Sequence, residues 1–240
     1  MTQVPNLRNQ RSQPLARQVY TALHQKILTF ELKPYQALSE TLVSEMLGVS
    51  RTPAREALTK LAEDKFVDIV PQRGTRVAPL REEDLDRSQF MREALELALL
   101  RRAMSSGNLD ALVQELRKQI TLQQTYVNFE DTKAFYAADE AFHALIAEYA
   151  KLPSVLPEIL RVKDHMDRFR HMMVESVEDL NTVISQHRDI VDTIEAGDAE
   201  GAERSMIVHL RRIFDYVDEA RGKFPEYFEA VDGKRAGARR

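Results

Sequence analysis

The stretch LKPYQALSETLVSEMLGVSRTPAREALTKLAEDKFVDIVPQRGTRV, residues 32–77, decides the fold of the N-terminal third of the chain. Ser39 is a suitable N-cap for a helix with apolar residues at helical spacing, and Gly48 stands where a left-handed C-terminal cap is expected. Ser50 precedes a further helix, and Pro53 is tolerated in its first turn because its missing N–H would have no partner there. Two helices joined by a tight glycine turn predict a helix-turn-helix.

Further elements flank this pair of helices. A helix over residues 15–30 precedes it, with apolar residues at helical spacing, and Pro34 closes that helix. After the pair, residues 66–70 are typical of a strand, and a Pro-Gln-Arg-Gly turn separates them from a second short strand at 75–78. Helix, helix, glycine turn, helix and hairpin is the order of a winged helix-turn-helix. We expect this domain to span residues 14–78.

The start of the third helix carries side chains suited to DNA. The N-terminal turn of a recognition helix enters the major groove, where arginine can hold guanine with two hydrogen bonds and hydroxyl groups can hold phosphate. The candidate contacts are Ser50, Arg51, Thr52 and Arg55 on this helix, with Gln72, Arg73 and Arg76 at the hairpin tip. The alternative from spacing alone is a solvated basic face on a helical subdomain.

Charge and composition fit a modular DNA-binding protein. The 240-residue chain has a net charge of −4, but residues 1–80 carry 11 lysines and arginines against 7 acidic residues, a net +4, and the remainder carries −8. Only the part near phosphate must be basic. No cysteine is present, which excludes disulfides, thiolate catalysis and cysteine–zinc sites. The sequence shows neither a secretory signal nor a bilayer-spanning apolar run, so we expect a cytoplasmic protein without a membrane partner.

The N-terminal stretch resembles the DNA-binding domain of the GntR superfamily of bacterial transcriptional regulators. The matching pieces are LSE, LGVSRTPxREAL and PxRGxxV. The resemblance implies DNA contacts from the recognition helix, a contribution of Ser50 at its cap, and a wing shaped by Gly74. Two positions depart from the family pattern: Tyr35 and Lys65 each stand where a glycine is usual. Both turns can be built differently here, but neither position is a proposed DNA contact.

The rest of the chain is expected to be helical. Six segments show helical periodicity, near 84–105, 108–127, 131–150, 153–176, 178–196 and 199–221. Short connections between them predict an antiparallel all-α bundle over residues 85–221, giving a mainly α protein. Residues 79–84 are the expected hinge. We expect residues 1–13 to be a disordered arm and residues 222–240 a basic flexible tail.

Four polar side chains interrupt the apolar faces of this predicted bundle. Asp139 and His143 are spaced i and i+4 on one helix, His187 lies among apolar residues on another, and His209 on a third. Burying them is costly unless they share a partner, which a divalent metal ion would be. The alternative is that each histidine is a core residue hydrogen-bonded to the backbone or a hydroxyl. On spacing alone the two interpretations are about equally supported.

The predicted bundle resembles the FCD effector domain of the FadR-type branch of the superfamily. The matching pieces are REALE at 92–96, DEAFH at 139–143, QHRDIVDTIEAGD at 186–198 and MIVHL at 206–210. The resemblance implies a divalent metal at the floor of a ligand pocket, zinc first, with nickel or manganese as alternatives. Its ligands would be Asp139, His143, His187 and His209.

Four protein ligands leave coordination positions open on such an ion. A small carboxylate effector is implied there, with Arg92 as the candidate second anchor because its neighbours Met91 and Leu95 suggest an inward-facing stripe. A surface salt bridge is the alternative role for Arg92. A homodimer on a palindromic operator is also implied, since two-fold protein symmetry matches two half-sites.

Three hypotheses follow for function. The first is a DNA-binding transcriptional regulator, a repressor in our expectation, controlled by a carboxylate at the metal. The second is a DNA-binding protein in which the metal is purely structural. The third is a metallohydrolase, because a metal with open positions can activate water. The sequence lacks an obvious general base for that reaction, so we expect a regulator that is not an enzyme.

Overall fold

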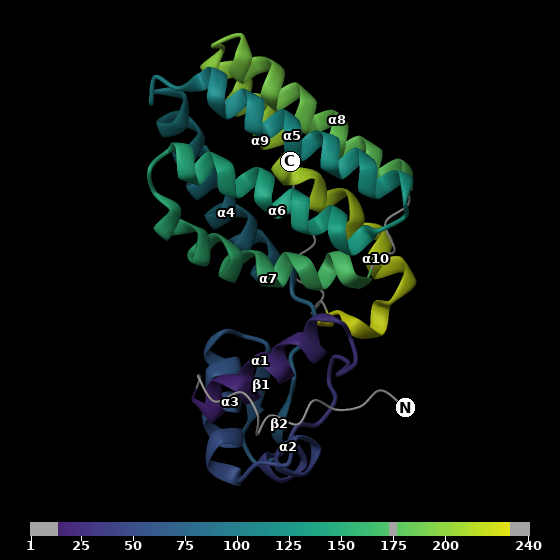
Figure 1. The fold of residues 1–240 in the computed structure, drawn as a ribbon. Helices are drawn as coiled ribbons and strands as arrows, with labels where there is room; N and C mark the ends of the chain where they lie inside the picture. The colour runs from purple at the N-terminus through teal and green to yellow at the C-terminus, as the bar shows by residue number, and fades with distance from the viewer. Residues whose placement is uncertain (1–13, 173–176, 231–240) are drawn as a thin grey trace. The chain divides into compact units, whose positions relative to one another are not determined.

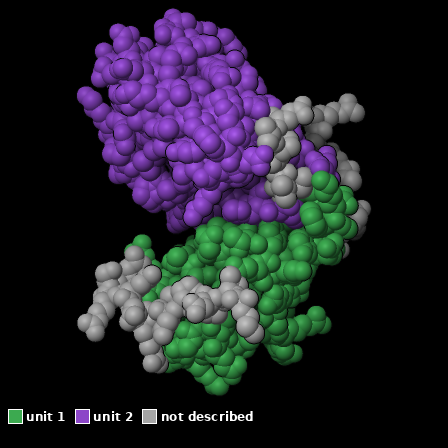
Figure 2. Space-filling view, turned by 45° about the vertical axis from the view of Figure 1, so that its right-hand side comes forward, with its two compact units in different colours: residues 1–81, 220–240 green, residues 82–219 purple. Residues whose placement is uncertain are grey.

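The computed structural model describes residues 14–172 and 177–230. The predicted N-terminal arm and residues 231–240 of the predicted tail lie outside this range. The described chain is mainly helical and divides into two compact units, one of residues 1–81 with 220–240 and one of residues 82–219 (Figure 2).

Residues 14–81 of the first unit form helices α1, α2 and α3 and a two-stranded hairpin (Figure 1). Ser39 caps the second helix by accepting a hydrogen bond from the backbone N–H of Leu42 at 3.1 Å. Gly48 ends that helix in the left-handed conformation, with φ 65°, as its sequence position predicts. The elements are α1 (Leu15–Leu28), α2 (Glu40–Leu47), α3 (Arg51–Glu63), β1 (Val67–Val70) and β2 (Gly74–Val77).

The hairpin gains a third backbone partner from the segment before α2. Strands β1 and β2 are antiparallel, with Val67 opposite Val77. The Tyr35 N–H donates to the Val77 carbonyl at 2.9 Å, and the Leu38 N–H donates to the Thr75 carbonyl at 2.8 Å. Residues 35–38 therefore lie along the outer side of β2 and connect the wing to the helical part of the unit.

The two departures from the glycine pattern keep the glycine conformation. Tyr35 has φ 67° and Lys65 has φ 63°, both in the left-handed region that side chains rarely adopt. The turns are thus the same in shape as a glycine would make them. Each position accepts conformational strain of order 1 kcal/mol instead.

The second unit is an antiparallel helical bundle (Figure 1). Its core is apolar, with contributions from every long helix, because each presents aliphatic and aromatic residues along one stripe. Helix α6 packs on α5 and α4, and α9 packs on α8 and α4. The helices are α4 (Glu82–Met104), α5 (Leu109–Asn128), α6 (Thr132–Tyr149), α7 (Leu156–Met172), α8 (Val177–Glu195) and α9 (Ala199–Arg211).

Two boundaries differ from the sequence expectation. Helix α4 begins at Glu82, so residues 82–84 of the predicted hinge are helical, since three acidic residues in the first turn favour a helix N-terminus. The last predicted helix is interrupted at 212–216 by a 3₁₀ turn and continues as α10 (Val217–Lys223).

The prediction that residues 222–240 form a flexible tail is wrong for the first part of this range. Pro225–Tyr227 forms a 3₁₀ turn, and Phe228 pairs with Leu80 in a parallel β-bridge. The aromatic ring of Phe228 is buried, which supplies the apolar contact that a flexible tail lacks.

Candidate functional site

The recognition-helix residues lie at the exposed N-terminal end of α3. Ser50 is the N-cap, and Arg51 and Thr52 are exposed in the first turn. Arg55 is also exposed, and its guanidinium donates to both carboxylate oxygens of Glu40 on α2, at 2.7 and 3.2 Å. Arg55 is therefore ion-paired with Glu40 within the same unit.

The wing residues surround a tight turn. Gln72 and Gly74 both have positive φ, at 62° and 83°, so the tip depends on two left-handed residues. Arg73 is exposed at the tip. Arg76, on β2, has its Nε 3.7 Å from a carboxylate oxygen of Asp68 and its guanidinium carbon 5.3 Å from the ring centre of Tyr35.

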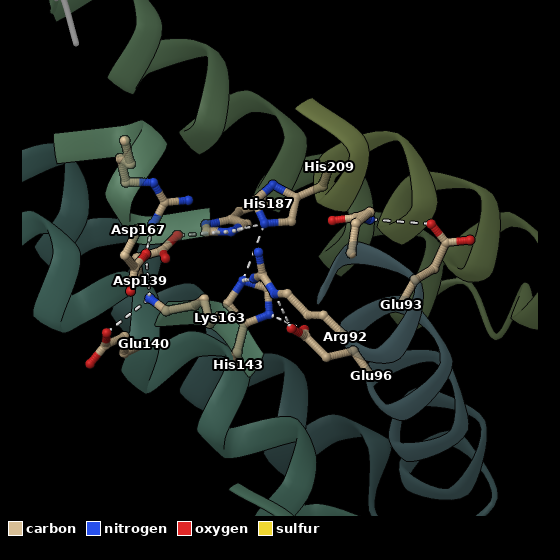
Figure 3. Close-up of polar contacts among 12 residues, drawn as sticks. Arg92, Glu93, Glu96, Asp139, Glu140, His143, Lys163, Asp167, His187 and His209 are labelled. Carbon is tan, nitrogen blue, oxygen red and sulfur yellow. Dashed lines mark hydrogen bonds and ion pairs between the residues drawn. The ribbon is translucent and has the colours of Figure 1, made fainter. Parts of the chain in front are cut away.

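The four candidate metal ligands meet inside the second unit (Figure 3). Asp139 and His143 come from α6, His187 from α8 and His209 from α9. One ligand atom from each residue lies within 4.8 Å of all the others. All four side chains are buried, and His187 is fully enclosed.

The closest distances match the edges of a metal coordination shell. His209 Nε2 lies 3.2 Å from His143 Nε2 and 3.3 Å from His187 Nε2, and Asp139 Oδ1 lies 3.6 Å from His187 Nε2. These three separations are compatible with ligands of one divalent ion, whose bonds would be about 2.0–2.2 Å long. The other pairs of ligand atoms lie within 4.8 Å.

Neighbouring groups favour tautomers that present each Nε2 as a lone pair. The Nδ1 atom of His187 lies 2.9 Å from the Gln123 amide oxygen, and that of His209 lies 3.3 Å from the Gln186 amide oxygen. The Nδ1 atom of His143 lies 2.5 Å from a carboxylate oxygen of Glu96. Oxygen acceptors beside each Nδ1 favour a proton there, as in carboxylate–histidine–metal arrangements.

The electrostatics keep this cluster ready for a cation. Burial lowers the pKa of His187 to about 3 and, with the neighbouring histidines, lowers that of His209 well below its ordinary value, so both rings are neutral at pH 7. Burial raises the pKa of Asp139, but the nearby histidines and Arg170 outweigh it, and the net pKa is below its ordinary value. Two neutral rings and one carboxylate therefore converge with the ring of His143.

This donor set fits a divalent metal ion. Neutral imidazoles and a carboxylate are ligands for zinc, nickel and manganese, and the oxygens behind the rings orient them. In the described residues no other group of three or more histidine, aspartate or glutamate side chains is arranged to hold a metal.

Arg92 lies beside the cluster rather than on the surface. It is 3% exposed, its Nε donates to Glu96 at 2.6 Å, and its Nη2 lies 3.4 Å from His143 Nε2 (Figure 3). Burial raises the pKa of Glu96, but Arg92 and His143 outweigh it and lower that pKa to about 2. Arg92 is thus both inward-facing and ion-paired. Met91, used as a marker of the inward stripe, is instead 40% exposed.

Two cavities adjoin the cluster, and both are lined by Arg92 and Asp139. The smaller, of about 20 Å³, has a cationic wall that includes Arg170 and Arg212. The larger, of about 240 Å³, lies among α4, α6 and α7 and has a mostly apolar wall. Its apolar residues are Ala141, Ala144, Leu156, Ile159 and Leu160.

Several residues of the site were not singled out from the sequence. Glu96 lies four residues after Arg92, a spacing that brings two side chains together on one helix face and could have indicated the pair. Gln186 directly precedes His187 in the chain but supports His209 instead. Gln123, on α5, carried no sequence signal.

No helix within residues 14–172 and 177–230 is long and apolar enough to span a membrane.

Two family models match this chain. Residues 15–77 match the family of bacterial regulatory proteins named gntR, and residues 89–212 match the FCD domain. A relative from Streptomyces ambofaciens, described as an uncharacterized HTH-type transcriptional regulator in an unstable DNA locus, is 36% identical over 227 residues that cover 93% of each chain.

Two further similarities concern Escherichia coli proteins. The HTH-type transcriptional repressor RspR of strain K12 is 31% identical over 217 residues, covering 90% of this chain and 95% of that protein. The solved structure of McbR/YncC superposes with a TM-score of 0.64 over 86% of this chain and 98% of that one, at 22% identity. The second similarity concerns the fold alone.

Proposed function

The chain belongs to the GntR family of bacterial transcriptional regulators and carries an FCD domain, and we propose that a metal-bound small carboxylate controls its binding to DNA. Like its family and its relatives, the protein is a DNA-binding transcriptional regulator and not an enzyme. The observation that carries the proposal is the convergence of three Nε2 atoms and the Asp139 carboxylate beside a buried arginine.

The metal would be held by Asp139, His143, His187 and His209, with zinc as the first candidate. Bound there, it would supply a Lewis-acidic centre with positions open to an anion. Glu96, Gln123 and Gln186 orient the three rings through the atoms opposite the ligand atoms. These supports keep the cluster in place whether or not an anion is present.

The charges of the buried groups favour a monoanionic group at the metal. Arg92 carries one positive charge, and Glu96 and Asp139 carry one negative charge each; a divalent ion brings the total to +1. Lys163, also buried at the larger cavity, is paired with Glu140 at 2.9 Å and leaves this sum unchanged. A single carboxylate neutralises this sum, which lowers the cost of burying the charges. Because Arg92 Nη2 lies 3.4 Å from a ligand atom, an anion bound beside the ligands meets a guanidinium donor.

The larger cavity supports an effector with an apolar body. Its volume of about 240 Å³ is below the usual range for drug-sized ligands, and its wall is mostly apolar. The polar residues that line this cavity are Arg92, Glu96, Asp139, Glu140, His143 and Lys163. A small carboxylic acid with a short aliphatic or aromatic body fits this combination.

Repression and dimerisation belong to the same proposal. RspR, which aligns over 90% of this chain, is a transcriptional repressor, and we propose the same direction of regulation here. A homodimer on a palindromic operator would pair two recognition helices. The exposed aromatic ring of Phe90 on α4, 76% accessible, supports a self-association face on that helix.

The test measures operator binding by fluorescence anisotropy, using DNA from the region upstream of the protein's own operon. Metal-free protein, zinc-loaded protein, and zinc-loaded protein with a panel of carboxylates of increasing apolar body are compared. We expect at least one carboxylate to shift the operator Kd of the zinc-loaded protein and to have no effect on metal-free protein. A Kd that no carboxylate shifts in either form contradicts the proposal.

Matched variants separate the roles of metal and anchor. Asp139→Asn is expected to weaken zinc binding and abolish the carboxylate response. Arg92→Lys keeps a positive charge beside Glu96 but loses the planar fork, so zinc binding should persist while the response requires more carboxylate. Arg101→Lys, on the exposed face of the same helix, is the control.

A purely structural metal is the alternative that the same measurements decide. In that case a chelator lowers the melting temperature, and every carboxylate leaves both melting temperature and operator Kd unchanged.

A further inference from the structure

We infer that residues 224–229, here called the C-terminal strap, position the wing arginine Arg76 for DNA. The inference concerns only the first unit and does not depend on the metal or the effector. It does rest on the proposed contact of Arg76 with DNA.

The strap is built into the DNA-binding unit by backbone pairing. The Leu80 N–H donates to the Tyr227 carbonyl at 2.8 Å, and the Glu229 N–H donates to the Leu80 carbonyl at 3.0 Å. Phe228 is 6% exposed, and the ring of Tyr227 stacks on Phe30 with ring centres 5.5 Å apart. Paired backbone and buried rings give the strap a defined place in this unit.

Tyr35 connects the strap to Arg76. Its hydroxyl donates to the Phe228 carbonyl at 2.9 Å, and its backbone N–H donates to Val77, the residue after Arg76. The Arg76 guanidinium carbon lies 5.3 Å from the centre of the Tyr35 ring, within range of a cation–π interaction. One side chain therefore touches both the strap and the wing arginine.

This connection explains a tyrosine in a backbone conformation that favours glycine. At φ 67° a glycine would avoid the strain, but it would offer neither the hydroxyl nor the ring. The hydrogen bond to Phe228 and the cation–π contact with Arg76 offset the strain of the tyrosine.

A chain of ion pairs is a second connection, or relay, between the strap and Arg76; the contacts of Tyr35 are the first. Arg81 Nε lies 2.9 Å from a carboxylate oxygen of Glu229 in the strap, and Arg81 Nη2 lies 3.0 and 2.8 Å from the two carboxylate oxygens of Asp68. Asp68 in turn lies 3.7 Å from Arg76 Nε. Because Arg81 binds Asp68 at both oxygens, it fixes the acidic partner of the wing arginine.

The two relays pre-orient a long side chain. A free arginine loses much of its rotamer freedom when it binds phosphate or a base edge, so an arginine already held between a ring and a carboxylate loses less. The strap also follows α9 and α10 directly in the chain, and α9 carries His209.

The test is a double-mutant cycle on operator binding, measured in the full-length protein at several salt concentrations. Arg76→Ala is expected to weaken binding and to reduce the slope of log Kd against log salt concentration by about one, the effect of one lost phosphate contact. Tyr35→Phe is expected to weaken binding several-fold in the wild-type background and to have no further effect in Arg76→Ala.

Further variants exclude a merely structural effect. Tyr35→Gly removes the backbone strain together with both contacts, so we expect unchanged or higher thermal stability with a loss of DNA affinity at least as large as that of Tyr35→Phe. Tyr20→Phe removes another phenol hydrogen bond of this unit, to Asp64 at 3.0 Å, and should leave the operator affinity unchanged. Glu229→Ala, which breaks the charge relay, should weaken binding in the same direction as Tyr35→Phe.

The outcomes distinguish the two parts of the inference. An unchanged salt slope in Arg76→Ala overturns the wing contact and the positioning role together. The positioning role alone is overturned if Arg76→Ala reduces the salt slope as expected but Tyr35→Phe does not change operator affinity in the wild-type background. It is also overturned if Tyr35→Phe weakens operator binding equally in the wild-type and Arg76→Ala backgrounds.

Discussion

At the scale of single residues, the two units have arginines in opposite surroundings. Arg51 is exposed at the start of α3, where its fork is available to a base edge. Arg92 is buried against Glu96, where it can meet only what enters the cavities of the bundle. The same side chain therefore has its proposed role as a DNA contact in one case and as an anion anchor in the other.

Arg51→Ala tests the DNA role directly. Loss of a bidentate base contact costs about 1–3 kcal/mol, so we expect a rise in operator Kd of roughly one order of magnitude, with a smaller rise on unrelated DNA. Anisotropy titrations on operator and scrambled duplexes measure both. Lys60→Ala, near the other end of α3, is the control and should leave both constants within about threefold. Equal affinity of Arg51→Ala and wild type for the operator means that the recognition helix is misassigned.

The buried histidines make the metal-free bundle sensitive to acid. The pKa of His187 is lowered from 6.5 to about 3, so between these values the unfolded chain binds a proton that the folded chain does not. Stability therefore falls as pH decreases from 6.5 towards 3, with a slope of up to about 1.4 kcal/mol per pH unit for this one group. Urea denaturation of metal-free protein at several pH values measures the slope, and His187→Gln should reduce it. A slope that is the same in the variant removes His187 as the cause.

At the scale of elements, the helix ends follow from local chemistry. Ser39 and Gly48 begin and end α2 as the sequence predicts, since a hydroxyl cap and a left-handed glycine are strong short-range signals. The interruption after α9 has no comparable signal: residues 212–216 have helical periodicity, yet Arg212 turns to bind Asp179 on α8 at 3.0 Å. A tertiary contact of this kind lies outside what local spacing can predict.

The ends of α2 provide a test at this scale. Ser39→Ala removes the side-chain cap and should lower the free energy of unfolding by about 1 kcal/mol. Gly48→Ala introduces a side chain at φ 65° and should lower it by about 1 kcal/mol as well. Thr41→Ala, on the exposed face of the same helix, is expected to change it little. Urea unfolding followed by circular dichroism measures all three, and a silent Gly48→Ala means that the turn does not need its left-handed residue.

At the scale of the whole molecule, the sequence predicts the family, the helical architecture and the four side chains that meet at the cluster. Asp139 and His143 could be paired because i, i+4 spacing on a helix is a local property. Glu96, Gln123 and Gln186 could not be assigned to particular rings, because their partners come from other helices. The C-terminal strap was missed for the same reason: its partner Leu80 lies far earlier in the chain.

The division into two units predicts two separable unfolding transitions. Each unit has its own apolar core, and the candidate metal ligands all lie in residues 82–219. Zinc at a hundredfold excess over its Kd should therefore raise the free energy of unfolding of the bundle by about 2.7 kcal/mol, and with it the temperature of that transition. The transition temperature of the DNA-binding unit should stay unchanged. Operator DNA should do the reverse. Scanning calorimetry with zinc, chelator and DNA, all without carboxylate, measures this, and a single transition raised equally by both ligands contradicts separate unfolding of the two units.

The proposed dimer can be tested by substituting an exposed residue of its candidate interface. Phe90 and Phe129 are the most exposed aromatic rings among the described residues, at 76% and 79%, but only Phe90 lies on α4, the helix that also carries Arg92. A large apolar side chain in water favours burial against a second copy, and a charge at its centre opposes it. Phe90→Glu should therefore shift the protein towards monomer in light scattering and weaken binding to a palindrome more than to a half-site, while Phe129→Glu changes neither. A Phe90→Glu protein that stays dimeric places the interface on another face, whereas a monomer that still binds the palindrome as tightly as wild type removes the need for a dimer in operator recognition.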